Sequence, residues 1–141
     1  MDKTYTKIFP SNPDLLPEIE SFVNKIVSKT DLSSQKIINM EMALAEATAN
    51  SILHGNKSDP NKNIEIIVIV SSQKIVIKIK DEGKGFIVKD VPDPTKDENM
   101  LKGSGRGLHI MKALVDNLEY NFTESGTETI ITINRISSKE K

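Results

Sequence analysis

The sequence lacks cysteine altogether and contains only two histidines, His54 and His109. Without cysteine there is no disulfide framework, no thiolate nucleophile and no cysteine-ligated zinc or iron–sulfur site. Two histidines are also too few for a histidine-rich metal site. Metal and redox chemistry based on thiolates is therefore excluded.

The chain also lacks an excess of either charge and any long apolar run. Its 19 basic and 20 acidic residues give a formal net charge of −1. This balance provides no electrostatic footprint for nucleic acid and no polybasic membrane anchor. No apolar segment approaches the ~18 residues of a transmembrane helix, and the N-terminal segment contains no signal core. We therefore expect a cytoplasmic protein with neither a nucleic-acid nor a membrane partner.

What is present is enough for one domain, because 141 residues can bury a core of their own. The spacing of apolar residues predicts strands grouped together and helices between them. In chain order these are a strand over Thr4–Phe9, a helix from Pro17 to about Lys29, a helix capped by Asp31 or Ser33 that runs to about His54, strands over Ile64–Val70 and Ile75–Asp81, a third helix opened by Gly103–Gly107 that runs to about Asp116, and strands over about Leu118–Thr123 and Thr127–Ile136. This order predicts an α+β fold with one layer of helices on one face of a sheet.

The second predicted helix carries apolar residues at helical spacing, which predicts that their face packs on the core. They are Ile38, Met42, Ala45, Ala49 and Ile52. At its end, Gly55-Asn56 predicts a left-handed stop.

Glu46 and Asn50 lie four residues apart on this helix, so both project from the same face, and His54 continues the line. One interpretation is an ordinary solvated stripe. The other is a lined cavity, because the pair lies among alanines that allow close approach. Asparagine is also a poor residue for a helix interior.

Asp81 follows the inward-facing isoleucines of its strand, and this phase predicts a buried carboxylate. A lone buried carboxylate needs a hydrogen-bond donor. That donor is either a backbone amide of the following turn or the exocyclic amine of a ligand. Gly83 and Gly85 permit close backbone approach here. Thr127 places a hydroxyl at the mouth of another strand, which we expect to lie near Asp81.

The turn Gly103-Ser104-Gly105-Arg106-Gly107 precedes the third predicted helix. Backbone amides at a helix N-terminus favour an anion such as phosphate, although the same glycines are equally compatible with a flexible hinge. The turn follows a long loop rather than a strand, so it is not the Rossmann fingerprint. The sequence contains no Walker A motif either.

Taken in order, these motifs resemble the GHKL ATPase superfamily, which includes gyrase-type ATPases and histidine kinases. Residues 46–55, EATANSILHG, are similar to its N-box, and residues 104–111, SGRGLHIM, are similar to its second glycine box. The likeness spans Glu41 to Ile133 and is strongest to the anti-sigma-factor serine/threonine-protein kinases. It implies the Bergerat ATP-binding fold, a two-layer α/β sandwich with helices on one face of a mixed, mainly antiparallel sheet.

The resemblance implies a role for each matched residue. Glu46 would be the general base, and Asn50 would hold Mg²⁺ beside ATP. Asp81 would accept a hydrogen bond from the adenine amino group, with Thr127 supporting it. Further nucleotide contacts would come from Gly83, Gly85, Ser104, Gly105, Arg106, Gly107 and Leu108, with Lys102 or Arg106 neutralising the γ-phosphate. His54 would approach the phosphates, although packing at the helix end explains it equally well.

The length predicts a single domain over residues 1–136, and the charged residues 137–141 predict a disordered tail. The resemblance implies a lid at about 88–104. It implies a homodimer that phosphorylates a STAS-domain antagonist and sequesters a sigma factor. The alternative is an ATP-gated partner-binding module with little or no kinase activity, and the presence of Glu46 favours the enzyme. Coincidental glycine turns in a small α+β domain would predict no nucleotide affinity at all. One departure from the family is the segment Asn56-Lys57-Ser58-Asp59-Pro60 after the N-box, where the family often has an aromatic residue after the histidine.

Overall fold

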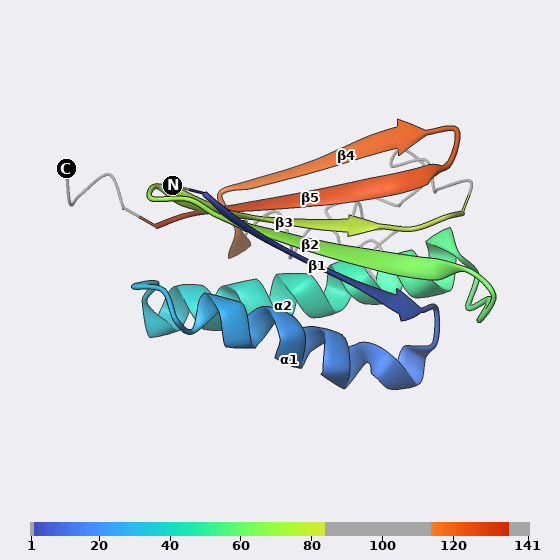
Figure 1. Ribbon diagram of the computed structural model, residues 1–141, viewed down its shortest axis with the longest axis horizontal. Coiled ribbons are helices and arrows are strands. Elements are labelled where there is room, and N and C mark those ends of the chain that lie inside the picture. Colours follow the sequence, from blue (N-terminus) through green and yellow to red (C-terminus); the bar gives the residue numbers. More distant parts are fainter. Residues whose placement is uncertain (1, 84–113, 136–141) are drawn as a thin grey trace, which may run out of the picture.

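The computed structural model describes residues 2–83 and 114–135. Helices cover one face of a sheet, which gives the molecule two layers (Figure 1). The strands are β1 (Lys3–Pro10), β2 (Asn63–Val70), β3 (Lys74–Lys80), β4 (Asn117–Thr123) and β5 (Gly126–Asn134), and the helical segments are η1 (Pro13–Leu15), α1 (Leu16–Val27), α2 (Ser34–Asn50) and η2 (Ser51–Gly55). This arrangement confirms the α+β sandwich predicted from the sequence. None of the helices in the described ranges is long and apolar enough to span a membrane.

The sheet has the strand order β1-β2-β3-β5-β4, and each neighbouring pair is antiparallel. The expectation of a mixed sheet is therefore wrong for the described strands. The reason lies in the connections. Tight turns join β2 to β3 and β4 to β5, while α1 and α2 run out and back beneath the sheet, so β2 begins at the end where β1 finished (Figure 1).

Local sequence signals explain where the two helices begin. Ser33 is the N-cap of α2, where its hydroxyl oxygen accepts a hydrogen bond from the Lys36 amide at 3.2 Å. Of the two caps considered from the sequence, Ser33 is therefore the one used. Pro17 lies in the first turn of α1, where its missing amide hydrogen costs nothing.

The core lies between the sheet and the two helices. Alternate residues of β2 and β3 face it and are fully buried, as the period-two pattern predicts. They are Ile64, Ile66 and Val68 on β2 and Ile75, Ile77 and Ile79 on β3. Each isoleucine contributes about 1.5–3 kcal/mol through its burial. The regular row on β3 also fixes the direction of the residue that follows the strand, Asp81.

The buried face of α2 differs from the stripe predicted for it. Ile38 and Met42 are 51% and 52% exposed, although Ile52 in η2 is buried as expected. The face that packs on the core consists of Met40, Ala43, Leu44, Ala47 and Thr48. The sequence of α2 contains two apolar stripes at helical spacing, and the sheet and α1 select the one that carries Met40 and Leu44.

The end of α2 also differs from the prediction. Asn56 has a φ of −89°, so Gly55-Asn56 is not a left-handed stop. The helix continues instead through the π-helical turn η2, and the left-handed residues are Lys57 and Ser58, with φ of 53° and 57°. Gly55 does not have a positive φ, so the left-handed conformation does not explain a glycine at this position.

Several predictions from the sequence fall outside the described residues. These are the glycine-rich turn, nearly all of the third helix, the lid at about 88–104 and the tail at 137–141. The remaining predicted strands and helices match the observed bounds to within a few residues.

Candidate functional site

The candidate site is built around Asp81, which directly follows β3 and is only 5% exposed. Its Oδ1 accepts hydrogen bonds from the backbone amides of Gly83 at 3.1 Å and Thr127 at 3.2 Å. Its Oδ2 is buried and has no hydrogen-bond partner in the part of the chain that the structure describes. The sequence left two donors open for this carboxylate, a backbone amide of the turn and the amine of a ligand. Both can be accommodated, because the backbone amides bind Oδ1 and leave Oδ2 available.

Burial raises the pKa of the Asp81 carboxyl above its usual value, because the charged form loses solvation. The amide hydrogen bonds from Thr127 and Gly83, and the positive charge of Lys62, act in the opposite direction without cancelling the effect. A half-satisfied buried carboxylate costs free energy unless another donor reaches its free oxygen. Asp81 is therefore a candidate acceptor for a ligand donor.

Thr127 lies beside Asp81, as the sequence predicts. The Asp81 amide donates to the Thr127 carbonyl oxygen at 2.9 Å, so the end of β3 and the start of β5 are bonded in both directions. The Thr127 side chain is buried, and its hydroxyl has no hydrogen-bond partner within the described ranges. A buried carboxylate oxygen and a buried hydroxyl therefore remain available at the same end of the sheet.

Gly55 brings the end of η2 into direct contact with Asp81. A Cβ atom at Gly55 would lie 2.3 Å from Asp81 Oδ2, and one at Gly83 would lie 1.6 Å from the Gly55 carbonyl oxygen. Neither position has room for a side chain. The close contact of Gly55 with Asp81 was not predictable from the sequence, since it joins segments that are distant in the chain.

Glu46 and Asn50 lie on α2 and are both half-buried. Tyr120 on β4 lies close enough to Glu46 for the two to interact electrostatically. The pKa of the Tyr120 hydroxyl is raised mainly by burial and further by the negative charge of Glu46.

The π-helical turn η2 follows Asn50. Its wider turn removes His54 from the helix face that Glu46 and Asn50 share, so the three residues do not form the single line predicted from their spacing of four. Its wide turn is closed by the Asn56 amide, which donates to the Ser51 carbonyl oxygen at 2.8 Å. His54 is exposed on this turn. The Ser51 hydroxyl is buried without a hydrogen-bond partner among the described residues. Ser51 was not predicted as a site residue. The only feature of the sequence that could have indicated it is its position as a small polar residue directly after Asn50.

Two cavities help to locate the site. One of about 140 Å³ is lined by Asp81, Thr127 and neighbouring residues of β3, β4 and β5. It is smaller than the roughly 300 Å³ at which small-molecule sites begin, so by itself it does not enclose a ligand of nucleotide size. The remaining predicted contacts, Gly85, Lys102 and residues 104–108, lie outside the described residues.

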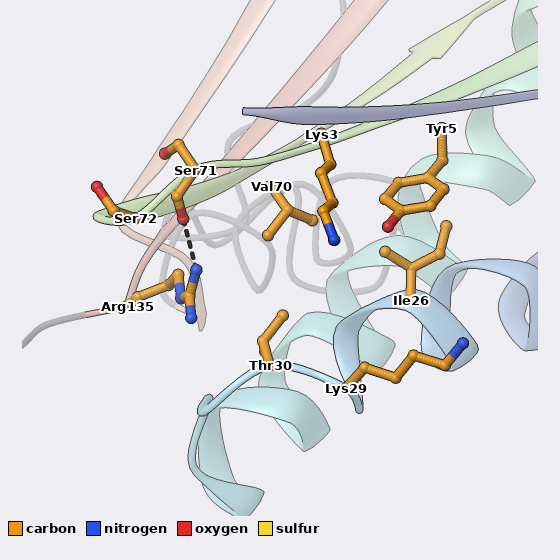
Figure 2. A pocket seen from close by; sticks show the side chains of 9 residues that line it. All are labelled: Lys3, Tyr5, Ile26, Lys29, Thr30, Val70, Ser71, Ser72 and Arg135. Carbon is orange, nitrogen blue, oxygen red and sulfur yellow. Dashed lines mark hydrogen bonds between the residues drawn. The ribbon is translucent and has the colours of Figure 1, made fainter. Parts of the chain in front are cut away.

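A larger cavity, of about 310 Å³, lies at the opposite end of the sheet (Figure 2). Its guanidinium, from Arg135, already pairs with Asp31 at 2.9 Å and donates to the Ser71 carbonyl oxygen at 2.6 Å. The cavity also borders the C-terminal end of α1, whose carbonyl groups disfavour an anion. Arg135 therefore joins the end of β5 to the α1–α2 loop and to the β2–β3 turn, and this cavity is not the candidate site.

Comparison with known proteins identifies what this arrangement is similar to. The profile of the histidine kinase-like ATPase domain matches residues 9–133. An anti-sigma F factor of Anoxybacillus flavithermus (strain DSM 21510 / WK1) is 31% identical over 121 residues, which cover 79% of this chain and 82% of the relative. The serine-protein kinase RsbW of Listeria monocytogenes is 22% identical, over 94% of this chain and 87% of the relative.

Solved structures share the fold. The RsbU and RsbW domains of a Mycobacterium tuberculosis protein align with a TM-score of 0.68 and 14% identity, covering 96% of this chain and 34% of that one. The histidine kinase domain of an Erythrobacter litoralis blue-light activated kinase aligns with a TM-score of 0.59 and 18% identity, covering 89% and 61%. The chain thus spans about a third of the first of these solved chains and less than two thirds of the second.

Proposed function

The chain belongs to the family of histidine kinase-like ATPase domains, and on that basis we propose that it is an ATP-binding anti-sigma factor with serine/threonine-protein kinase activity. The names of its relatives support this function, since they include anti-sigma F factors and a serine-protein kinase. The observation that carries the nucleotide assignment is the buried, unsatisfied Oδ2 of Asp81 at the end of β3.

The chemistry of that end of the sheet fits adenine. Asp81 Oδ2 is an acceptor without a donor, and the exocyclic amine of adenine is a donor. The Thr127 hydroxyl can donate to a ring nitrogen or to a bridging water. Guanine presents a carbonyl oxygen where adenine has its amine, so it would place two acceptors against each other. The site should therefore discriminate in favour of ATP.

The residues of α2 fit the phosphate end of the nucleotide. Mg²⁺ binds few protein ligands and completes its shell with phosphate oxygens and water, so the Asn50 amide oxygen is a suitable donor. When bound, Mg²⁺ would offset the charge that develops as a phosphoryl group is transferred. Glu46, one turn earlier and half-buried, would accept the proton of the attacking hydroxyl.

The names of the relatives support a sigma-factor partner, and the remaining partner assignments rest on the family resemblance of the sequence. We propose that the chain binds a sigma factor, phosphorylates a serine or threonine of a STAS-domain antagonist, and acts as a homodimer in the cytoplasm. The roles of His54, Gly85, Lys102 and residues 104–108 at the phosphates also belong to this proposal.

Phosphoryl transfer tests the proposed activity. Purified chain with radiolabelled ATP and Mg²⁺ should label one of a panel of STAS-domain proteins from the same organism. Glu46→Ala should reduce the transfer rate by about 100-fold or more, because general-base catalysis contributes that much. Glu41→Ala is the matched control, since Glu41 is exposed on the same helix and should leave the rate unchanged.

Two outcomes would contradict this account. Full transfer by Glu46→Ala would remove Glu46 from the catalytic role. ATP binding by the wild type without transfer to any member of the panel would support the ATP-gated partner-binding module instead of the kinase.

A further inference from the structure

Asn56 begins the segment 56–60, in which the sequence departs from the family pattern, and its side chain is fully buried. It follows η2 directly and precedes two left-handed residues, Lys57 and Ser58. A buried carboxamide is costly unless its donors and acceptor are used. Asn56 satisfies this condition with three partners on three different segments.

The three hydrogen bonds connect the beginning of the fold to both central strands. Asn56 Nδ2 donates to Ser11 Oγ, just after β1, and to the Asn63 carbonyl oxygen at the start of β2, at 3.0 Å. Asn56 Oδ1 accepts from the Glu82 amide at 2.8 Å. Both donor hydrogens and one lone pair of the carboxamide are therefore used.

The contact with Glu82 is the one that reaches the candidate site. Glu82 lies between Asp81 and Gly83, so its amide belongs to the turn that holds the Asp81 carboxylate. Gly55, the residue that precedes Asn56 in the chain, lies against Asp81 Oδ2. The pair Gly55-Asn56 therefore contacts the Asp81–Gly83 turn twice, once by close packing and once by a hydrogen bond.

The backbone directly after Asn56 has an unfavourable conformation that neighbouring hydrogen bonds stabilise. Lys57 and Ser58 have φ of 53° and 57°, a region that L-residues with side chains seldom adopt. Such residues persist where neighbouring contacts determine the conformation. Here the Ser58 amide donates to the Ile52 carbonyl oxygen at 2.7 Å, and the Asp59 amide donates to the Asn56 carbonyl oxygen at 3.0 Å.

We propose that Asn56 is a positioning residue for nucleotide recognition, which sets the location of the Asp81 carboxylate by fixing the Glu82 amide. This inference rests on the proposed function, because it concerns the same adenine site. The phosphate chemistry should not depend on Asn56, because Glu46 and Asn50 lie on α2 and have no hydrogen bond to Asn56 among the described residues. Loss of Asn56 should thus affect base recognition and leave the transfer step intact.

Base discrimination separates this role from a purely structural one. The experiment measures the Kd of the full chain for ATP and for GTP, with Asn56→Ala and with Ile75→Val as the control. Ile75 is buried at the far end of β3, so its truncation lowers stability without touching the Asp81 turn. We expect Asn56→Ala to lower the preference for ATP over GTP by about tenfold, a loss of about 1.4 kcal/mol, and Ile75→Val to preserve it.

Kinetics supply a second readout on the same variants. Asn56→Ala should raise the KM for ATP and leave kcat at saturating ATP within about twofold of the wild type. Ser11→Ala, which removes only one partner of Asn56, should shift the ATP preference in the same direction by a smaller factor. This milder variant decides the question if Asn56→Ala does not fold.

The outcomes distinguish the inference from the function on which it rests. A wild type that binds ATP no more tightly than GTP would contradict the adenine site itself. A wild type that discriminates, together with an unchanged preference in folded Asn56→Ala, or in Ser11→Ala where Asn56→Ala does not fold, would overturn the positioning role of Asn56 alone.

Discussion

At the scale of single residues, the site depends on polar atoms that are buried before any ligand arrives. Asp81 Oδ2, Thr127 Oγ1 and Ser51 Oγ are buried without hydrogen-bond partners in the described residues. Burial of such atoms lowers the stability of the folded state, because each one loses its hydration without gaining a hydrogen bond. Asp81 and Thr127 place two such atoms at one end of the sheet, as a preformed ligand site requires. Their presence implies that the unliganded protein is less stable than it could be.

The pH dependence of stability follows from Asp81. Its carboxyl pKa is raised in the folded state from 3.8, so the folded protein holds this proton more tightly than the unfolded chain. Between 3.8 and the raised value the unfolded state binds fewer protons at this group, and the contribution of Asp81 to the unfolding free energy therefore falls as pH rises.

Replacing the carboxylate should remove this contribution. We expect Asp81→Asn to increase the free energy of unfolding at pH 7, with the gain vanishing below pH 3.8. Urea denaturation of both proteins at several pH values measures the difference. An Asp81→Asn protein that is less stable than the wild type at pH 7 and equally stable at low pH would contradict a desolvated carboxylate.

Some of these residues were predictable from the sequence and others were not. The period of β3 predicts that Asp81 faces inward, and the phase of β5 predicts that Thr127 does the same. Gly55 and Asn56 could not be assigned in this way. Their roles depend on contacts with the Asp81–Gly83 turn, and no local pattern in the sequence encodes a contact between distant segments.

At the scale of secondary structure, α2 and η2 form one continuous helical segment with two functions. Its α-helical part packs on the core through Met40 and Leu44 and presents Glu46 and Asn50. Its π-helical end places Gly55 against Asp81. Widened helical turns of this kind are found often at functional sites. The existence of this helix was predictable, but its buried face was not, because two apolar stripes compete.

Truncation of each stripe tests which one forms the core. Leu44→Ala should cost about 2–5 kcal/mol of unfolding free energy, since Leu44 is fully buried. Met42→Ala removes a side chain that is 52% exposed and should cost about 0.5 kcal/mol or less. Chemical denaturation gives both values. Equal losses, or a larger loss for Met42→Ala, would contradict the observed packing of α2.

At the scale of the whole molecule, the two ends of the sheet have different tasks. One end joins Asp81, Thr127, Gly55 and Asn56 in a connected group around buried polar atoms. At the other end, Arg135 connects the end of β5 to Asp31 in the α1–α2 loop. It also donates to Ser71 in the β2–β3 turn (Figure 2). The two-layer fold leaves the helices on one face only, so the residues of α2 and the ends of β3 and β5 meet at the first of these ends.

The central claim is that Asp81 recognises the adenine of ATP, and calorimetric titration of ATP tests it most directly. The proteins compared are the wild type, Asp81→Asn and the control Asp14→Asn, whose aspartate is exposed. Loss of a hydrogen bond to a charged group costs about 1.5–3 kcal/mol, so Asp81→Asn should weaken ATP binding by about tenfold or more. The wild type and Asp14→Asn should bind alike. A wild type without affinity for ATP, or an Asp81→Asn variant that binds ATP as tightly as the wild type, would contradict the account.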